Sequence, residues 1–331
     1  YVGGPVLSPP ADSDVDLTDL NVTASETDIG TGQTGTTTEL LDIIVDAVAD
    51  TPDVDGIDDS GNEGATLDID VPLALTGEEV NAGGIGLDDG SEQISSIVIS
   101  PASGVDLNDF VITKGGVPVA LDGSGNVVLS NRSELADLQI TPKDAHFVGS
   151  IDLEITLNTV DVASDGEFNN GNDTASASDV ITLTWKPVAN PPSVEVNNGI
   201  DDALVLEDGS VVVDVTGTLD PAGSGNEVLS LTLSGVDLTQ LDNFSAAPGP
   251  DGEVWTRVPG TPDSDASFTI TLNNGGVNYV GSFTFEPKAD SDVDLSGMEV
   301  VASAFEPATS TTADSGADSF NVIVDAVADT P

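Results

Sequence analysis

The sequence has no cysteine, a single histidine and only six basic residues against 59 acidic ones in 331 residues. Without cysteine, disulfides and thiolate metal sites are impossible, and a catalytic triad would depend on His146 alone. The formal net charge of -53 repels nucleic acid and anionic membrane surfaces, so neither is expected as a partner. The charge favours cations instead, above all Ca²⁺, which prefers carboxylate and carbonyl oxygens.

The chain also lacks long hydrophobic runs and helical periodicity. No run approaches the ~18 apolar residues of a membrane span, and one short turn near residues 133–138 is the only helical pattern that we predict. Hydrophobic residues nevertheless make up 38% of the chain, which is enough to form a core. They alternate with polar residues, as in Ile151, Leu153 and Ile155, and clusters of Asn, Asp, Gly and Ser separate the runs. This period of two predicts antiparallel sheets with one face buried.

The sequence repeats itself over long distances. The segment Val45-Asp-Ala-Val-Ala-Asp-Thr-Pro52 returns identically at residues 324–331, and a diverged copy, Trp185-Lys-Pro-Val-Ala-Asn-Pro-Pro192, lies between them. The copies are spaced by 140 and 139 residues, which is the size of a domain. Ala11-Asp-Ser-Asp-Val-Asp-Leu17 returns in the same way at residues 289–295. We therefore expect two whole domains, residues 53–192 and 193–331, and interpret residues 1–52 as the closing third of another.

Several short alternating strands in about 140 residues predict an all-β fold of tandem immunoglobulin-like antiparallel β-sandwiches. A closed barrel is the alternative. The repeats also resemble the immunoglobulin-like extender domains of giant bacterial RTX adhesins that type I systems secrete. The motifs that carry this resemblance are Glu207-Asp-Gly209, Leu87-Asp-Asp-Gly-Ser-Glu92, the strand end Leu233-Ser-Gly235, Phe285-Glu-Pro287 and the Ala-Val-Ala-Asp-Thr-Pro terminator. The resemblance implies an extracellular, bacterial cell-surface protein with a cadherin-like arrangement, in which calcium lies at the domain junctions.

The acidic residues at the two domain junctions are the main candidate Ca²⁺ ligands. Five acidic side chains follow the first terminator within eleven residues, where they repel one another unless a cation neutralises them. The candidates at the first junction are Asp50, Asp53, Asp55, Asp58, Asp59 and Glu63. Those at the second are Asn190, Glu195, Asn198, Asp201, Asp202, Glu207 and Asp208. The alternative at both places is a solvated acidic loop.

Further candidates lie in other loops. One set is Asp88, Asp89 and Glu92, with Asp220 and Glu227 as the counterparts in the next repeat. Asp165 and Asp173 form a loop before the last strand of their repeat, and Asp329 belongs to the final terminator. For each, an ordinary polar turn is the alternative to a calcium site.

The function expected from these features is structural. A calcium-stiffened extender would contact neighbouring repeats of the same long chain and project a ligand-binding tip for adhesion and biofilm formation. Alternatives are a glycan- or peptide-binding module of such an adhesin, or a surface-layer or filament subunit. For a glycan, Trp255 is the candidate stacking residue, whereas Trp185 closes an alternating strand and is expected in the core. A catalytic site is not expected, because the acidic residues show no pattern of a carboxylate pair in an apolar cleft.

Overall fold

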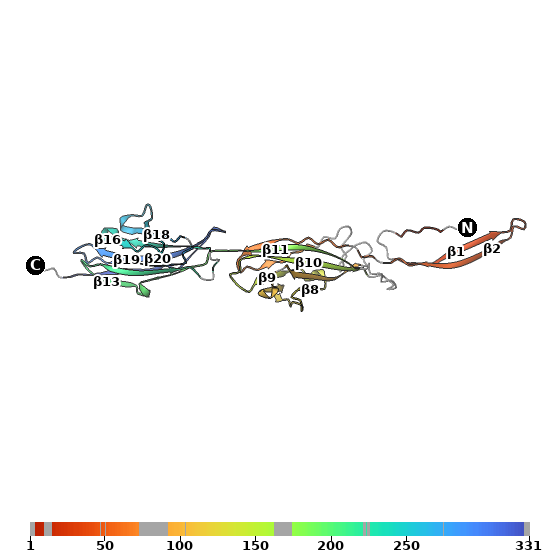
Figure 1. Ribbon diagram of the computed structural model, residues 1–331, viewed down its shortest axis with the longest axis horizontal. Helices are drawn as coiled ribbons and strands as arrows, with labels where there is room; N and C mark the ends of the chain where they lie inside the picture. Colours follow the sequence, from red (N-terminus) through yellow and green to blue (C-terminus); the bar gives the residue numbers. More distant parts are fainter. Residues whose placement is uncertain are drawn as a thin grey trace. The chain divides into compact units, whose positions relative to one another are not determined.

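The computed structural model describes residues 4–9, 15–46, 48–49, 51–72, 92–102, 104–161, 174–220, 223, 226–273 and 275–327 (Figure 1). Over these residues the regular elements are strands and three-residue 3₁₀ turns, so the predicted all-β class is confirmed. The chain forms two compact units: unit 1 is residues 1–145 with 149–184, and unit 2 is residues 146–148 with 185–331. The repeat boundaries at 52/53 and 192/193 stay a prediction. Within the described residues, no helix is long and apolar enough to cross a membrane.

The first strands form a hairpin. Strands β1 (Leu17–Thr27) and β2 (Thr34–Ile43) pair antiparallel in a two-stranded sheet. Almost every residue of both strands is exposed, including Val22 and Leu40.

Unit 1 contains two further sheets (Figure 1). The first has the order β3-β11-β10-β5-β8, with β3 at Asp59–Asn62, β5 at Glu92–Pro101, β8 at Val127–Leu129, β10 at Gly149–Asp161 and β11 at Thr174–Lys186. The second has the order β4-β9-β6-β7, with β4 at Leu67–Asp68, β6 at Phe110–Lys114, β7 at Val117–Pro118 and β9 at Leu138–Pro142. The 3₁₀ turns are η1 (Leu107–Asp109) and η2 (Arg132–Glu134), the second close to the predicted helical turn.

Unit 2 is a sandwich of two sheets. One has the order β12-β14-β19-β16, with β12 at Ser193–Val196, β14 at Val211–Thr218, β16 at Leu241–Ala246 and β19 at Asn278–Pro287. The other has the order β13-β22-β20-β15-β18-β17, with β13 at Asp202–Leu206, β15 at Val228–Val236, β17 at Thr256–Arg257, β18 at Ala266–Thr271, β20 at Leu295–Glu306 and β22 at Asp318–Asp325; β21 (Thr311–Asp314) pairs with β20. Three short 3₁₀ turns are η3 (Asn197–Gly199), η4 (Leu238–Gln240) and η5 (Asp263–Asp265).

The two units share their central pairing. In unit 1, β5 pairs with β8 and β10, and β9 pairs with β4 and β6; in unit 2, β15 pairs with β18 and β20, and β19 pairs with β14 and β16. In unit 2 the opening segment is divided: β12 pairs with β14 in one sheet, and β13 pairs parallel with β22 in the other. A first strand that divides between both sheets is an immunoglobulin-like feature, because it closes the sandwich along one side.

The alternating residues form the cores. Leu229, Leu231 and Leu233 are fully buried in unit 2, where they belong to one cluster with Phe283 and Phe320. Ile151, Leu153, Ile155 and Leu157 are at most 4% exposed in unit 1. Trp185 is buried and meets Phe147 edge-on with ring centroids 5.4 Å apart, so its expected core position is confirmed. Period-two alternation thus placed the core correctly.

Candidate metal centre

Two buried glutamates, Glu227 and Glu306, lie on neighbouring strands at the end of the unit 2 core. Val228 of β15 pairs with Phe305 of β20, so one position further out Glu227 lies opposite Glu306. Both are on the inward face, and their exposed fractions are 3% and 0%. Like charges on opposite antiparallel strands repel, and a buried charge is costly unless another group compensates it. Backbone N–H donors supply part of that compensation, and a cation would add to it.

Backbone N–H groups donate hydrogen bonds to both carboxylates. Glu227 Oε1 accepts the Asn190 N–H at 2.5 Å, and Glu306 Oε1 accepts the Ala308 N–H at 2.9 Å. A β-carbon at Gly223 would stand 2.3 Å from Glu227 Oε2 and 3.3 Å from the Asp220 carbonyl oxygen. Glycine at 223 therefore makes room for the Glu227 carboxylate beside that carbonyl. The structure brings together three of the predicted ligands here: Asn190, Asp220 and Glu227.

An acidic pair stands at the same place in unit 1. The register of β5 and β10 pairs Glu92 directly with Asp161. Asp28 directly follows β1. The repeat offset of 278 residues aligns Asp28 with Glu306. Our sequence reasoning missed Glu306, Asp161 and Asp28. The signal was available, because the internal alignment places an acid at this point in every copy.

The predicted loop after the first terminator does not form one cluster. Asp58 Oδ1 accepts the Thr182 N–H at 2.7 Å, and Asp59 Oδ2 accepts the Asp68 N–H at 3.0 Å. These two carboxylates therefore hold the loop to β11 and β4. Asp53 and Asp55 are exposed, and Glu63 is half-buried with a buried Oε2.

The predicted residues of the second junction are spread along unit 2. Glu195 and Asn198 are exposed. Asp202 Oδ1 accepts from Asn321 Nδ2 at 2.8 Å, next to the exposed Asp201. Glu207 Oε1 accepts the Val327 N–H, and Asp208 Oδ1 accepts the Asp290 N–H at 3.3 Å. Glu207 thus contacts the terminator of its own repeat, rather than Asn190.

The other predicted ligands lie outside the described residues: Asp50, Asp88, Asp89, Asp165, Asp173 and Asp329, together with the side chain of Glu92. In the described part of the chain, no three His, Cys, Asp or Glu side chains gather closely enough to hold a metal ion by themselves. A cation at Glu227 and Glu306 therefore needs amide or backbone oxygens as further ligands. Ca²⁺ is the ion that accepts such a mixed set of six to eight oxygens.

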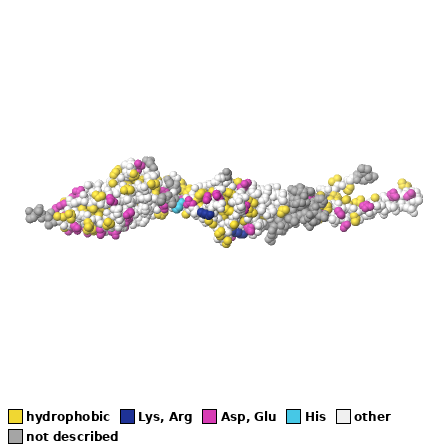
Figure 2. Space-filling model, turned by 60° about the horizontal axis from the view of Figure 1, so that its bottom comes forward, with side chains coloured by type: hydrophobic (Ala, Val, Ile, Leu, Met, Phe, Trp, Pro, Cys, Tyr) yellow, Lys and Arg dark blue, Asp and Glu magenta, His cyan; other side chains and the backbone are white. Residues whose placement is uncertain are grey.

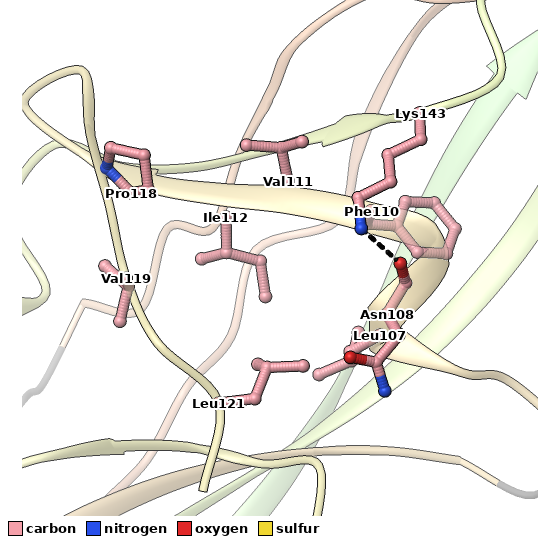
Figure 3. Close-up of a pocket in the computed structure, with 9 residues that line it drawn as sticks. All are labelled: Leu107, Asn108, Phe110, Val111, Ile112, Pro118, Val119, Leu121 and Lys143. Atoms are coloured by element: carbon pink, nitrogen blue, oxygen red, sulfur yellow. Dashed lines mark hydrogen bonds between the residues drawn. The ribbon is translucent and has the colours of Figure 1, made fainter.

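A surface hollow of about 240 Å³ lies in unit 1 beside β6 (Figure 3). Its lining is mostly apolar and consists of Leu107, Asn108, Phe110, Val111, Ile112, Pro118, Val119, Leu121 and Lys143. The Lys143 ammonium donates to the Asn108 carbonyl at 2.6 Å, as the dashed line shows. This lining supplies no carboxylate, so the hollow is unrelated to the acidic pairs. On the face shown in Figure 2, acidic side chains of the described residues are scattered rather than gathered in one patch.

Trp255, the candidate stacking residue, is held in the aromatic core of unit 2. Its indole N–H donates to the Tyr279 hydroxyl at 2.8 Å, and that hydroxyl donates to the Ala247 carbonyl at 2.7 Å. The indole ring meets Phe283 edge-on at 5.1 Å. The polar edge of Trp255 is thus occupied within the domain.

Comparison with known proteins gives no family. No family model matches the sequence, and no curated protein matches it. Solved structures that match include the C-terminal domain of the Streptococcus agalactiae AgI/II polypeptide BspA, at 12% identity over 82% of this chain and 99% of that chain, with a TM-score of 0.26. The collagen adhesin from S. aureus matches at 11% identity over 82% and 91%, with a TM-score of 0.21. The major pilin subunit BcpA of Bacillus cereus matches at 10% identity over 65% and 64%, with a TM-score of 0.27. These likenesses are too low to assign a function to this chain.

Proposed function

We propose that this chain is an extender segment of a large bacterial surface adhesin, secreted by a type I system, in which Ca²⁺ stiffens a row of immunoglobulin-like repeats. The row would project a ligand-binding tip for adhesion to cells or surfaces and for biofilm formation. The observation that carries the proposal is the buried pair Glu227 and Glu306, whose first member accepts the backbone N–H of the linker residue Asn190. A cation bound there would tie the linker to the domain that follows it.

The donors around the pair suit Ca²⁺ by their chemistry. Glu227 Oε1 accepts the Asn190 N–H and Glu306 Oε1 accepts the Ala308 N–H. The two carboxylates, the Asp220 carbonyl beside Glu227 and the Asn190 side chain are the groups that would hold the ion. Bound Ca²⁺ would neutralise the two buried charges. The chain has six basic residues for 59 acids, so at least 53 carboxylates have no lysine or arginine of their own. An excess of carboxylates of this size favours binding of cations.

The structural role is favoured over a glycan-binding module by the position of Trp255. A sugar ring stacks on an exposed aromatic face, whereas Trp255 is half-buried and its indole N–H donates to the Tyr279 hydroxyl. Repetition of one domain with the same strand pairing is, in contrast, what an extender needs.

The test is calcium binding by the full chain. At a Ca²⁺ concentration 100 times its Kd, the native state should gain about 2.7 kcal/mol, because the ion binds the folded form. We expect Tm to rise on going from chelator to millimolar Ca²⁺, and titration calorimetry to show saturable binding. Glu227→Gln and Glu306→Gln should each weaken the same shared site and so reduce the rise in Tm. Glu286→Gln, at an exposed position of β19, is the matched control and should leave both unchanged.

Two results would contradict the proposal. One is a melting curve that is the same in chelator and in calcium. The other is full calcium binding by the double variant Glu227→Gln and Glu306→Gln, which would separate calcium from this centre.

A further inference from the structure

The β1–β2 hairpin reproduces one strand pair of unit 2 residue by residue. Four register partners in the hairpin correspond to four between β20 and β22, with a displacement of 278 residues from β1 to β20 and 279 from β2 to β22. They are Leu17↔Ile43, Leu20↔Leu41, Asn21↔Leu40 and Val22↔Glu39 in the hairpin, and Leu295↔Val322, Met298↔Phe320, Glu299↔Ser319 and Val300↔Asp318 in unit 2. Both pairs have a register shift at the same point, between Leu17 and Leu20 and between Leu295 and Met298.

The backbone and its hydrogen bonds repeat as well. At the shift, Asp19 has φ 59° where Gly297 has φ 74°, and both are in the left-handed region. The Asp19 N–H donates to Asp42 Oδ1 at 2.8 Å, and the Gly297 N–H donates to Asn321 Oδ1 at 3.0 Å. A second bond, from Val45 N–H to Asp16 Oδ1, recurs in the same way between Val324 and Asp294. The hairpin therefore already has the geometry that this pair has inside a complete domain.

Unit 2 shows what covers the pair in a complete domain. There β20 pairs on its other edge with β15, and β22 pairs with β13. The inward residues Met298, Val300 and Ala302 are fully buried. In the hairpin the residue corresponding to Val300 is Val22, which is 54% exposed, and no third described strand pairs with β1 or β2.

We propose that the β1–β2 hairpin is a docking surface for the opening part of a repeat of this kind. The partner is a polypeptide segment with the strand pattern of residues 193–278, that is, the elements from β12 to β18. An open strand edge offers unpaired backbone groups to an added strand, and the exposed apolar face provides the burial. The register follows from unit 2, where Leu231 lies opposite Ala302 and Leu233 opposite Val300. In the docked hairpin the same leucines would lie opposite Ala24 and Val22.

Polar residues of the hairpin agree with this partner. Glu39 stands at the position of Asp318, whose Oδ2 accepts the Val196 N–H of β12 at 2.6 Å, so Glu39 would accept the corresponding N–H of the partner. Glu26 stands at the position of Ala304, where unit 1 has the fully buried Thr159, so a complete domain tolerates a polar side chain there. A second copy of the hairpin is a poorer partner, because Glu26 and Glu39 of both copies would share one interface.

The decisive experiment adds strands of this pattern to the chain. Tyr1 aligns with Tyr279, so residues 193–278 joined directly in front of Tyr1 of the full chain would complete the strand order. Hydrogen exchange of the amides in residues 17–45 should slow by at least about 100-fold relative to the chain without the addition, because those amides become part of a cooperative core. In a control, Leu231→Asp and Leu233→Asp in the added segment alone should leave exchange as fast as in the parent chain.

The register is tested separately by disulfide trapping. The chain has no cysteine, so one pair can be introduced cleanly. Ala24→Cys with Leu231→Cys in the added segment should cross-link on oxidation, whereas Ala24→Cys with Ser234→Cys, three positions away and on the opposite face, should not. If the joined chain aggregates, a synthetic peptide of residues 226–236 carrying Leu231→Cys is added to full-length Ala24→Cys and should cross-link in the same way.

Unchanged exchange in the joined chain, or equal cross-linking by both cysteine pairs, would overturn the proposal. It would also be overturned if the chain without any addition formed dimers that Val22→Asp dissociates, since the occupant would then be a second copy. These outcomes do not depend on calcium and leave the proposed function untouched.

Discussion

Many acidic residues of this chain act as acceptors for backbone N–H groups. Asp122 Oδ1 accepts from Ser124 and Asn126, and Asp106 Oδ1 accepts from Asn108. Backbone donors lower the pKa of Asp122 and of Asp106 below the usual range, since these bonds favour the ionised form. At the scale of the residue, part of the acidic composition therefore shapes turns and is independent of any metal.

Glu253 accepts backbone N–H groups with both of its carboxylate oxygens. It is buried, its Oε1 accepts the Asn273 N–H at 2.9 Å and its Oε2 accepts the Asp251 N–H at 3.0 Å. The bond from Asn273 is the main cause that lowers the pKa of Glu253. A lowered pKa stabilises the fold above the pKa of the unfolded chain, and the contribution is lost as pH falls through the folded value. We expect Glu253→Gln to lower Tm at neutral pH, with the difference from the parent disappearing in acid. Melting curves across pH check this; a constant difference would contradict it.

Tyr279 connects two polar groups inside unit 2. Burial raises the pKa of its hydroxyl, which accepts from Trp255 and donates to the Ala247 carbonyl. We expect Tyr279→Phe to destabilise the fold by about 1–3 kcal/mol, because it leaves the half-buried Trp255 N–H and Ala247 carbonyl without their partner. Denaturant unfolding measures the loss, and the emission of Trp255 should shift as its N–H loses the bond. A stability equal to that of the parent chain would show that water replaces the hydroxyl.

At the scale of the element, the segment before β3 is held against β11. Asp179 Oδ2 accepts the Gly56 N–H at 2.8 Å, which is the main cause that lowers the pKa of Asp179. Asp58 Oδ1 accepts the N–H of Thr182, which lies in the same strand, β11. Gly56 must be glycine for a steric reason, because a β-carbon there would lie 2.2 Å from Ile181 Cγ2.

Gly56→Ala should therefore destabilise unit 1. Ile181 is fully buried and has little room to move, so we expect a loss of about 1–3 kcal/mol. Gly123→Ala is the matched control, since a β-carbon at Gly123 would meet no atom within 4 Å. Denaturant unfolding of the two variants should separate them clearly, and equal stabilities would show that the segment before β3 relaxes away from Ile181.

At the scale of the whole molecule, the net charge of -53 acts against compactness, because like charges repel over the surface. Two sandwich units joined by a short linker move relative to each other by default unless a large apolar interface or another constraint holds them. The backbone contact between Asn190 and Glu227 suggests where such a constraint would act.

Small-angle scattering of the full chain tests that constraint. If Ca²⁺ stiffens the linker as proposed, millimolar calcium should give a narrower distribution of elongated shapes than chelator does. Glu227→Gln should keep the chelator profile at the same calcium concentration, while circular dichroism shows that the strands are retained. Asp201→Ala with Asp202→Ala is a second variant, since those residues contact Asn321 rather than the linker, and we expect it to behave like the parent chain. Profiles that are the same with and without calcium would place any bound metal inside a domain.

Period-two alternation and internal repetition, both visible in the sequence, determined the all-β class, the buried strands around Leu231 and Ile155, and the core position of Trp185. Those patterns are local, because side chains on a strand alternate between its faces wherever the strand lies. The sequence alone did not show that Glu227 and Glu306 lie on opposite strands, since they are 79 positions apart and are related only by the register of β15 with β20. In the same way, the sequence did not show that Asp58 Oδ1 accepts the Thr182 N–H, because residues 58 and 182 are brought together only by the fold. Whether a carboxylate is left for a cation depends on which backbone donors the tertiary structure brings to it.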